Sequence, residues 1–179
     1  MKIAISGLHG QGKTTILNAL KDIEIFKDFT FVDSPTRALI GTHSINEAGT
    51  QDTQAAIMFQ HYINQINDNV IVDRCALDGM AYTSYFTEQI SLTIYSVLRS
   101  LYLYLVNRYD IIFYIEPELD LVSDGTRSVN LPFFEAVKNN FEYLIRSDKI
   151  KVVSVQGTVE QRIKKIIDTY TIYKETHKK

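Results

Sequence analysis

The sequence predicts an α/β fold in which helices cover both faces of a five-stranded parallel sheet. Short, continuously apolar runs alternate with longer stretches of helical spacing, which is typical of parallel sheets that are buried on both sides. The first apolar run leads directly into a glycine-rich loop. The chain of 179 residues contains no repeat, low-complexity segment or linker. We therefore expect a single domain over residues 1–168, with a sizeable hydrophobic core.

The order of elements follows from the apolar pattern. Strands are expected at residues 2–6, 29–33, 69–73, 110–115 and 151–155, and helices at residues 13–21, 55–66, 76–86, 90–107, 131–145 and 159–167. Within the second helix, Ala56, Phe59, Ile63 and Ile66 have the spacing of one helix face. Residues 169–179 are polar and basic, and we expect a frayed C-terminal tail there.

Charge and cysteine content indicate which partners and cross-links are disfavoured or excluded. The 19 Lys and Arg residues against 21 Asp and Glu give a formal net charge of -2. Nucleic acid is thus a disfavoured partner, because proteins that grip phosphate backbones usually carry a basic surplus, although a local basic patch would be compatible with this total. Cys75 is the only cysteine, which excludes an intramolecular disulfide and fits a cytoplasmic protein.

The longest apolar segment, residues 90–106, is interrupted by hydroxyl side chains and by Arg99. A central arginine is costly in a membrane, so we expect a buried helix and no membrane partner. A homodimer interface on this helix is a further option.

The glycine-rich loop indicates phosphate binding. Residues 7–14 read Gly-Leu-His-Gly-Gln-Gly-Lys-Thr and fit the pattern G-x-x-x-x-G-K-[ST]. Backbone N–H groups of such a loop converge on phosphate oxygens, Lys13 can reach the β and γ phosphates, and the Thr14 hydroxyl can bind Mg²⁺. The predicted cofactors are ATP and Mg²⁺. The expected ATP-binding residues are Gly7, Gly10, Gln11, Gly12, Lys13, Thr14 and Thr15.

Two carboxylates close neighbouring predicted strands. Asp33 ends the second strand and Asp73 the third, and ligands of parallel sheets bind beyond these strand ends. Phosphoryl transfer needs one carboxylate to orient or deprotonate the acceptor and another near the metal. We therefore expect catalytic roles for Lys13, Asp33 and Asp73, with Asp73 and Thr14 as metal ligands. Asp33 could instead cap a helix, a task for which Ser34 competes.

Three short segments carry a resemblance to a known group of enzymes: Asp33-Ser-Pro-Thr-Arg37, Phe59-Gln60-His-Tyr62 and Asp73-Arg74-Cys-Ala-Leu-Asp78. Together with the loop, they resemble the deoxynucleoside kinase and thymidylate kinase superfamily. The similarity is greatest to the compact P-loop kinases that include the ribosylnicotinamide kinase domain.

The resemblance implies a three-layer P-loop NTPase fold and substrate-binding roles for Asp33, Gln60 and Arg74, with Gln60 contacting a nucleobase. Arg37 is a further candidate for substrate binding. Surface ion pairs for the two arginines, and a solvated amide for Gln60, are the structural alternatives. Many relatives carry Glu where Asp33 stands.

A lid is expected over about residues 117–130. Residues 124–128, Asp-Gly-Thr-Arg-Ser, are similar to the lid of these kinases, in which an arginine closes over the ATP phosphates. Arg127 would stabilise charge on the transferred group and is the fourth catalytic candidate. A simple Asp-Gly turn with an exposed arginine is the alternative.

The function expected from these features is ATP-dependent transfer of the γ-phosphoryl group to a nucleoside, a nucleotide or a similar small acceptor. A kinase that acts on a modified base in DNA and a nucleotide-binding NTPase switch are the two alternatives. The identity of the acceptor depends on pocket shape and on a few hydrogen bonds, which the sequence does not give.

Overall fold

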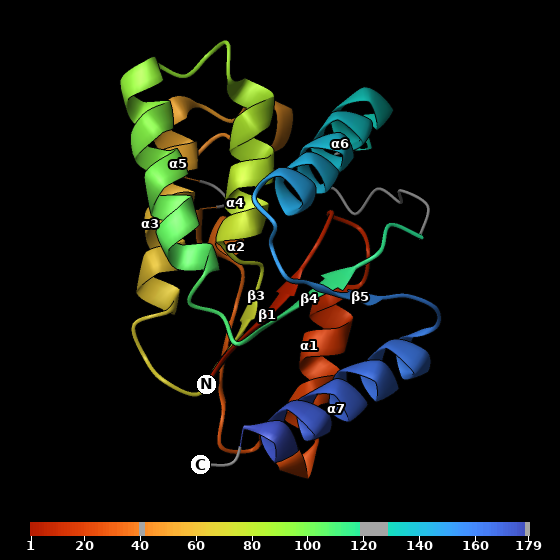
Figure 1. Cartoon of the computed structure of the whole chain (residues 1–179). Coiled ribbons are helices and arrows are strands. Elements are labelled where there is room, and N and C mark those ends of the chain that lie inside the picture. The colour runs from red at the N-terminus through yellow and green to blue at the C-terminus, as the bar shows by residue number, and fades with distance from the viewer. Residues whose placement is uncertain (40–41, 119–128, 178–179) are drawn as a thin grey trace.

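A computed structural model describes residues 1–39, 42–118 and 129–177 of the chain (Figure 1). All strand pairs are parallel, in the order β2-β3-β1-β4-β5. The strands are β1 (Lys2–Ser6), β2 (Thr30–Val32), β3 (Val70–Asp73), β4 (Ile111–Ile115) and β5 (Val153–Val155). The helices are α1 (Lys13–Lys21), α2 (Pro35–Leu39), α3 (Gln51–Asn64), α4 (Ala76–Thr83), α5 (Leu92–Val106), α6 (Leu131–Ser147) and α7 (Val159–Thr176).

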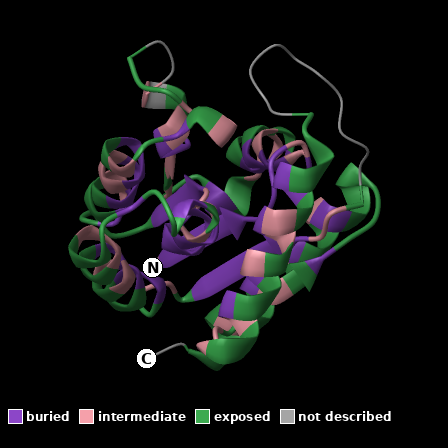
Figure 2. Cartoon of the chain, turned by 90° about the horizontal axis from the view of Figure 1, so that it is seen from above, coloured by how far each residue is buried: buried purple, intermediate pink, exposed green. Residues whose placement is uncertain are grey.

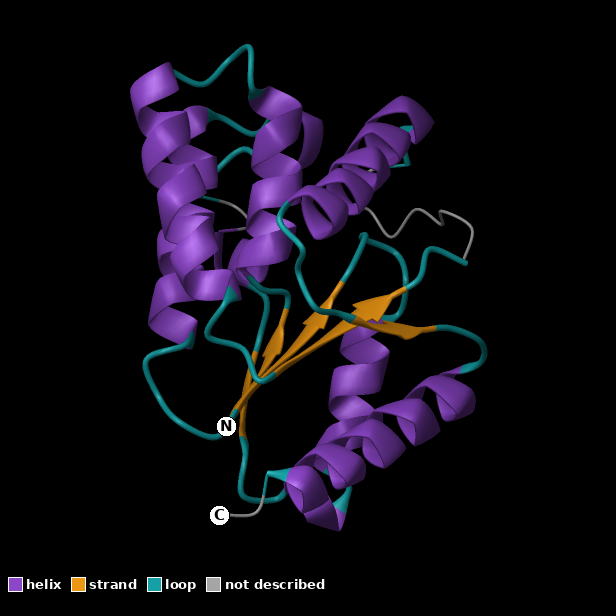
Figure 3. Ribbon diagram, viewed as in Figure 1, coloured by secondary structure: helices purple, strands orange, loops and turns teal. Residues whose placement is uncertain are grey.

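The sheet lies between two helical layers, which confirms the expected three-layer fold (Figure 3). Helices α3, α4, α5 and α6 pack on one face, and α1 and α7 pack on the other. Every residue of β1 and β4 is buried, as Figure 2 shows at the centre of the molecule. Burial of each large apolar side chain in these layers stabilises the fold by about 1.5–3 kcal/mol.

Helix α3 does not bury the face that the apolar spacing predicted. Phe59 and Ile63 are exposed, and so is Ile66 beyond the helix end. The buried side chains of α3 are Thr53, Gln54, Ile57, Met58 and His61. The inner face is partly polar, and its polar side chains Thr53, Gln54 and His61 border a pocket, which is described below.

The end of the chain corrects a second expectation. Residues expected to fray continue α7 as far as Thr176. Tyr170 is buried, and its ring centroid lies 4.8 Å from that of Phe26. The segment therefore contributes to the core beneath β1 instead of forming a polar tail.

Helix α5 packs as a half-buried helix of the domain. Leu98, Tyr102 and Leu105 are buried, and Arg99 forms an ion pair of 2.5 Å with Asp148 at the end of α6. Across the residues that the structure describes, we find no helix with the length and apolar content that a membrane crossing requires.

Candidate active site

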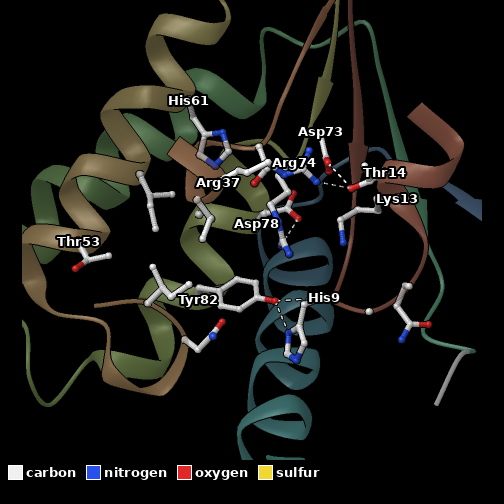
Figure 4. Close-up of a pocket in the computed structure, with 18 of the residues that line it drawn as sticks. His9, Lys13, Thr14, Arg37, Thr53, His61, Asp73, Arg74, Asp78 and Tyr82 are labelled. Carbon is white, nitrogen blue, oxygen red and sulfur yellow. Dashed lines mark hydrogen bonds and ion pairs between the residues drawn. The ribbon is translucent and has the colours of Figure 1, made fainter. Parts of the chain in front are cut away.

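A pocket opens at the carboxyl ends of the strands, between the glycine-rich loop and helices α2, α3 and α4 (Figure 4). It brings together most of the predicted site residues, namely Gly10, Gln11, Gly12, Lys13, Thr14, Arg37, Asp73 and Arg74. Gly7, Thr15, Asp33 and Gln60 do not line it. The lid residue Arg127 lies outside the residues that the structure describes.

The loop between β1 and α1 has the shape of a phosphate cradle. Gly7 has φ of 132°, and a Cβ at this position would lie 2.7 Å from the Ile115 carbonyl oxygen, so only glycine fits. Gly12 caps α1 in a left-handed conformation with φ of 78° and supplies no side-chain hydrogen bond. The first amides of α1 thus lack a side-chain cap, as expected of a helix start that binds anions. Lys13 is buried, and its Nζ donates a hydrogen bond to the Leu8 carbonyl.

Oxygen donors suited to Mg²⁺ lie beside this cradle. The Thr14 Oγ1 donates a hydrogen bond of 3.0 Å to the Asp73 Oδ2, and it accepts one of 3.0 Å from Arg37 Nη2. No group of three His, Cys, Asp or Glu side chains that could hold a metal occurs in the described part of the chain. Two hard oxygen ligands still suit Mg²⁺, which takes its remaining positions from water and substrate phosphates.

Asp33 lies at the rim of the site. The pairing of Val32 with Val72 places Asp33 next to Asp73 at the edge of the sheet, as predicted. Its side chain is 61% exposed and is 3.6 Å from Arg37 Nη1. Asp33 thus forms an ion pair with Arg37, which lines the pocket, but Asp33 itself does not line it.

Arg74 sits in an unusual backbone conformation directly after β3. Its φ of 71° is rare for a residue with a side chain and is typical of functional sites. The guanidinium carbon lies 5.4 Å from the centre of the Tyr82 ring, and Nη1 lies 3.3 Å from Asp78 Oδ1. Burial alone would lower the pKa of Arg74, but the acidic groups around it, Tyr82, Asp78 and Asp73, raise that pKa overall. Arg74 is therefore a permanent cation in the pocket.

Asp78 connects this arginine to the phosphate loop. Its carboxylate accepts hydrogen bonds from Ser6 Oγ at 2.7 Å, from the Gly7 amide at 3.2 Å and from the Cys75 amide at 2.9 Å. Sequence reasoning quoted Asp78 without giving it a role. Asp78 is the third residue of α4, a position at which an acidic side chain commonly caps the start of a helix. This local pattern could have identified it.

A second connection joins the loop to α4 and α6. The ring Nδ1 of His9 is 2.8 Å from the Tyr82 hydroxyl oxygen, which also accepts a hydrogen bond from the His9 amide. The His9 ring stacks on Phe133 and meets Phe134 edge-on, with centroids 6.0 and 5.4 Å away. Burial is the main cause of the raised pKa of Tyr82. Tyr82 thus stays neutral and links His9 with Arg74.

The inner face of α3 forms another wall of the pocket. Gln54 and His61 line it, whereas Gln60 donates a hydrogen bond of 2.9 Å to Asn64. The contact with an acceptor that was expected of Gln60 therefore has no place in this pocket. The side-chain amide oxygen Oε1 of Gln54 accepts a hydrogen bond of 3.3 Å from Thr83 Oγ1.

On the opposite side of the loop, Arg162 of α7 is buried and contacts three segments. It donates hydrogen bonds to the Gly157 carbonyl at 2.7 Å, to the Gln11 carbonyl at 2.8 Å and to Glu118 at 2.9 Å. A hydrogen bond from the Gly157 amide is the main reason that the pKa of Glu118 is lowered, and Arg162 adds to the effect. Arg162 therefore fixes the backbone of the phosphate loop relative to Glu118, near the start of the expected lid.

Comparison with solved structures shows the same fold in other proteins. Deoxyadenosine kinase from M. mycoides, solved with the products dCMP and dCDP, shares 18% identity at a TM-score of 0.63, over 96% of this chain and 99% of that one. NadR protein in complex with NR shares 16% identity at a TM-score of 0.70 over 99% of this chain. The match spans only 51% of the NadR chain, about half its length.

YorR protein from Bacillus subtilis, in complex with phosphorylated GDP, shares 14% identity at a TM-score of 0.62, over 100% of this chain and 99% of that one. No curated protein matches the sequence. A family model described as an AAA domain matches residues 2–162. The chain therefore belongs to this AAA-domain family, and it shares its fold with deoxyadenosine kinase, NadR and YorR.

Proposed function

We propose that the protein is an ATP-dependent kinase that transfers the γ-phosphoryl group to a nucleoside, a nucleotide or a nucleoside-like small acceptor. One observation carries the proposal. A single pocket extends from the phosphate loop at Lys13, past Asp73 and Arg74, to the polar wall of α3. A nucleotide hydrolase without an acceptor has no need of this second, polar compartment.

Each end of the pocket has a chemical task in this proposal. The loop amides and Lys13 bind the ATP phosphates, and Thr14 and Asp73 hold Mg²⁺, which would neutralise charge on the β and γ phosphates. The acceptor oxygen attacks the γ phosphorus, its new P–O bond replaces the bond to the β-phosphate oxygen, and ADP leaves. A carboxylate takes the acceptor's proton, and the arginines balance charge on the transferred group.

Asp73 and Asp33 are the two candidates for that carboxylate. Asp73 lines the pocket and is buried, whereas Asp33 lies at the rim beside Arg37. We therefore assign Asp73, which bonds to Thr14, to the metal, and propose Asp33 as the base that takes the acceptor's proton. Arg127 remains our proposal for the lid cation. The variant Asp33→Asn, assayed for kcat at saturating substrates, separates the two carboxylates.

The similar structures support the acceptor class. They describe a deoxyadenosine kinase with dCMP and dCDP, NadR with NR, and YorR with phosphorylated GDP, all of which are nucleosides or nucleotides. With identities below 20%, this support extends to the class and not to one compound.

The test is ATP consumption with Mg²⁺ across nucleosides, deoxynucleoside monophosphates, nicotinamide riboside and hydroxymethylated DNA. We expect one free acceptor to accelerate turnover, and Lys13→Ala to abolish it. Lys21→Ala is the matched control, since Lys21 lies at the far end of the same helix and bonds to Asn18. Stimulation by DNA alone would indicate the polynucleotide kinase, and ATP hydrolysis that no acceptor accelerates would indicate the NTPase switch.

We further propose a cytoplasmic homodimer. Exposed apolar side chains on the neighbouring helices α3 and α5, among them Phe59, Ile63, Val97 and Tyr104, support an interface there. Light scattering on a size-exclusion column tests it, with Tyr104→Glu expected to shift the mass to that of a monomer. A monomeric wild type would contradict it.

A further inference from the structure

Unsatisfied hydrogen-bonding groups collect in the proposed acceptor compartment. Five buried side-chain atoms in the described part of the chain lack a hydrogen-bond partner, and three of them belong to residues that line this pocket. They are the Ser34 hydroxyl oxygen and both ring nitrogens of His61. Because buried polar groups in native proteins are nearly always paired, such a cluster in a pocket indicates partners supplied by a ligand.

A glycine in α4 leaves space for the side chain of His61. A Cβ at Gly79, inside α4, would lie 3.1 Å from the His61 Cδ2 atom and 3.1 Å from the end of the Met58 side chain. Glycine inside a helix is less favourable than alanine. At Gly79 it provides the space in which the imidazole ring lies against α4.

His61 is held in its neutral form. Burial, with a further contribution from the charge of Arg74, lowers the pKa of His61 to about 3. A neutral imidazole offers one N–H donor and one nitrogen acceptor, and no charge. It suits the polar edge of an uncharged heterocycle and lacks the positive charge that would attract a phosphate.

The two ends of the pocket therefore differ in chemistry. Figure 4 shows His61 on α3, across the pocket from Lys13 and Thr14, while Arg74 lies between them. Positive charge is concentrated at the phosphate end, and the α3 wall is neutral and polar. An acceptor with an uncharged ring at one end and the reacting oxygen at the other would fit this order.

We propose that His61 recognises the uncharged heterocycle of a nucleoside-type acceptor by hydrogen bonding, and that Ser34 supplies a second hydrogen bond to the same acceptor. This inference rests on the proposed kinase function and specifies it: the acceptor is selected by its ring, at His61, and not by the amide of Gln60. His61 and Ser34 are specificity residues in this account, with no part in the transfer of the phosphoryl group.

The experiment compares His61→Phe, Ser34→Ala and Met58→Leu with the wild type. Phenylalanine keeps the ring and removes both nitrogens, and Met58 is the control because it is buried on the same helix and also contacts Gly79. Nucleoside binding is measured by calorimetry in the presence of a non-hydrolysable ATP analogue. We expect acceptor affinity to fall roughly 10- to 100-fold in His61→Phe and several-fold in Ser34→Ala, since partners left unpaired on burial weaken binding strongly.

Three further readouts separate recognition from a structural role. Affinity for the ATP analogue should change less than twofold in all variants, and Met58→Leu should keep wild-type acceptor affinity. Discrimination between acceptors with different base edges should decrease in His61→Phe. In the wild type, the ring ¹⁵N signals that disappear in His61→Phe should shift when the acceptor is added.

Folded His61→Phe protein with wild-type acceptor affinity and selectivity would overturn this inference while leaving the kinase intact. If His61→Phe does not fold, unchanged acceptor binding by Ser34→Ala, together with a wild type in which no histidine ring ¹⁵N signal shifts on addition of the acceptor, would overturn it equally. Wild-type protein that binds ATP but no second nucleoside, nucleotide or nucleoside-like acceptor would instead refute the proposed function, and this inference with it.

Discussion

Acid should destabilise this protein through one buried side chain. The pKa of His61 is lowered from 6.5 in its ordinary state to about 3 in the fold, because burial and the nearby charge of Arg74 oppose protonation. Below pH 6.5 the unfolded chain binds a proton at this position and the folded chain does not. Stability that is present above pH 6.5 is therefore lost as the pH falls toward 3.

The size of the effect follows from the two values. At pH 4.5, two units below the ordinary value, the loss is about 2.7 kcal/mol, at 1.36 kcal/mol for each unit. Such a loss is a large share of the roughly 5–15 kcal/mol by which domains are stable. Asp73 and Asp78 line the same pocket, and Arg74 is the cation that opposes a charged His61 most directly.

The assay is urea denaturation of the wild type, His61→Phe and Met58→Leu at pH 7.5, 5.5 and 4.5. The other titrating groups are common to all three proteins, so the wild type should lose about 2.7 kcal/mol more than His61→Phe between pH 7.5 and 4.5. Met58→Leu should follow the wild type. Parallel pH dependence in the wild type and His61→Phe would refute the reasoning, whatever their absolute stabilities.

Three other substitutions test the phosphate loop and its supports. Thr14→Ala should reduce kcat/KM roughly 10- to 100-fold and raise the Mg²⁺ concentration needed for half-maximal rate, because a hard oxygen ligand is lost; an unchanged Mg²⁺ titration would contradict that role. Asp78→Asn should lower the free energy of unfolding by about 1–3 kcal/mol, since its hydrogen bonds to charged and buried donors weaken, and unchanged urea midpoints would count against it. Arg162→Met leaves the Gln11 carbonyl without this donor and should raise the KM for ATP about tenfold. Arg146→Met, on an exposed surface, should leave the KM for ATP unchanged. Equal KM values for the two variants would contradict the proposal that Arg162 supports the phosphate loop.

The fold was predictable from the sequence because its signals are local. Strands β1, β3 and β4 are buried on both sides, so they are continuously apolar and stand out from the helices. The glycine-rich loop has a fixed pattern that demands a strand before it and a helix after it. Helix α2 was missed, because its five residues are too few to show a period.

The wall of the site was harder to predict, for a physical reason. Sequence periodicity identifies the apolar face of a helix as the buried one, but α3 turns Gln54 and His61 inward because a pocket lies there. Its apolar face, with Phe59 and Ile63, is outward. Gln60 was expected at the pocket from the family resemblance alone, whereas Gln54 and His61 are the polar side chains of α3 that line it.

Arg162 and Asp78 were not among the predicted site residues, for a related reason. Both contact the phosphate loop over long distances in the chain, and Arg162 reaches the Gln11 carbonyl 151 positions away. The capping position of Asp78 is a local pattern, but it does not specify the contacts with Ser6 and Gly7, and no local pattern specifies those of Arg162. Only the packing of α7 and α4 around the sheet brings these contacts together.

The last turns of α7 limit how far the chain can be shortened from its C-terminal end. The family match ends at residue 162, yet the ring of Tyr170 packs against Phe26 and Phe29, with centroids 4.8 and 5.8 Å away. A protein cut after residue 168 would keep every residue proposed for catalysis and still leave these two aromatic rings facing water. Exposed rings of this kind promote association between molecules. Expression trials that trim the helix should therefore yield aggregates, even though the nucleotide site is untouched.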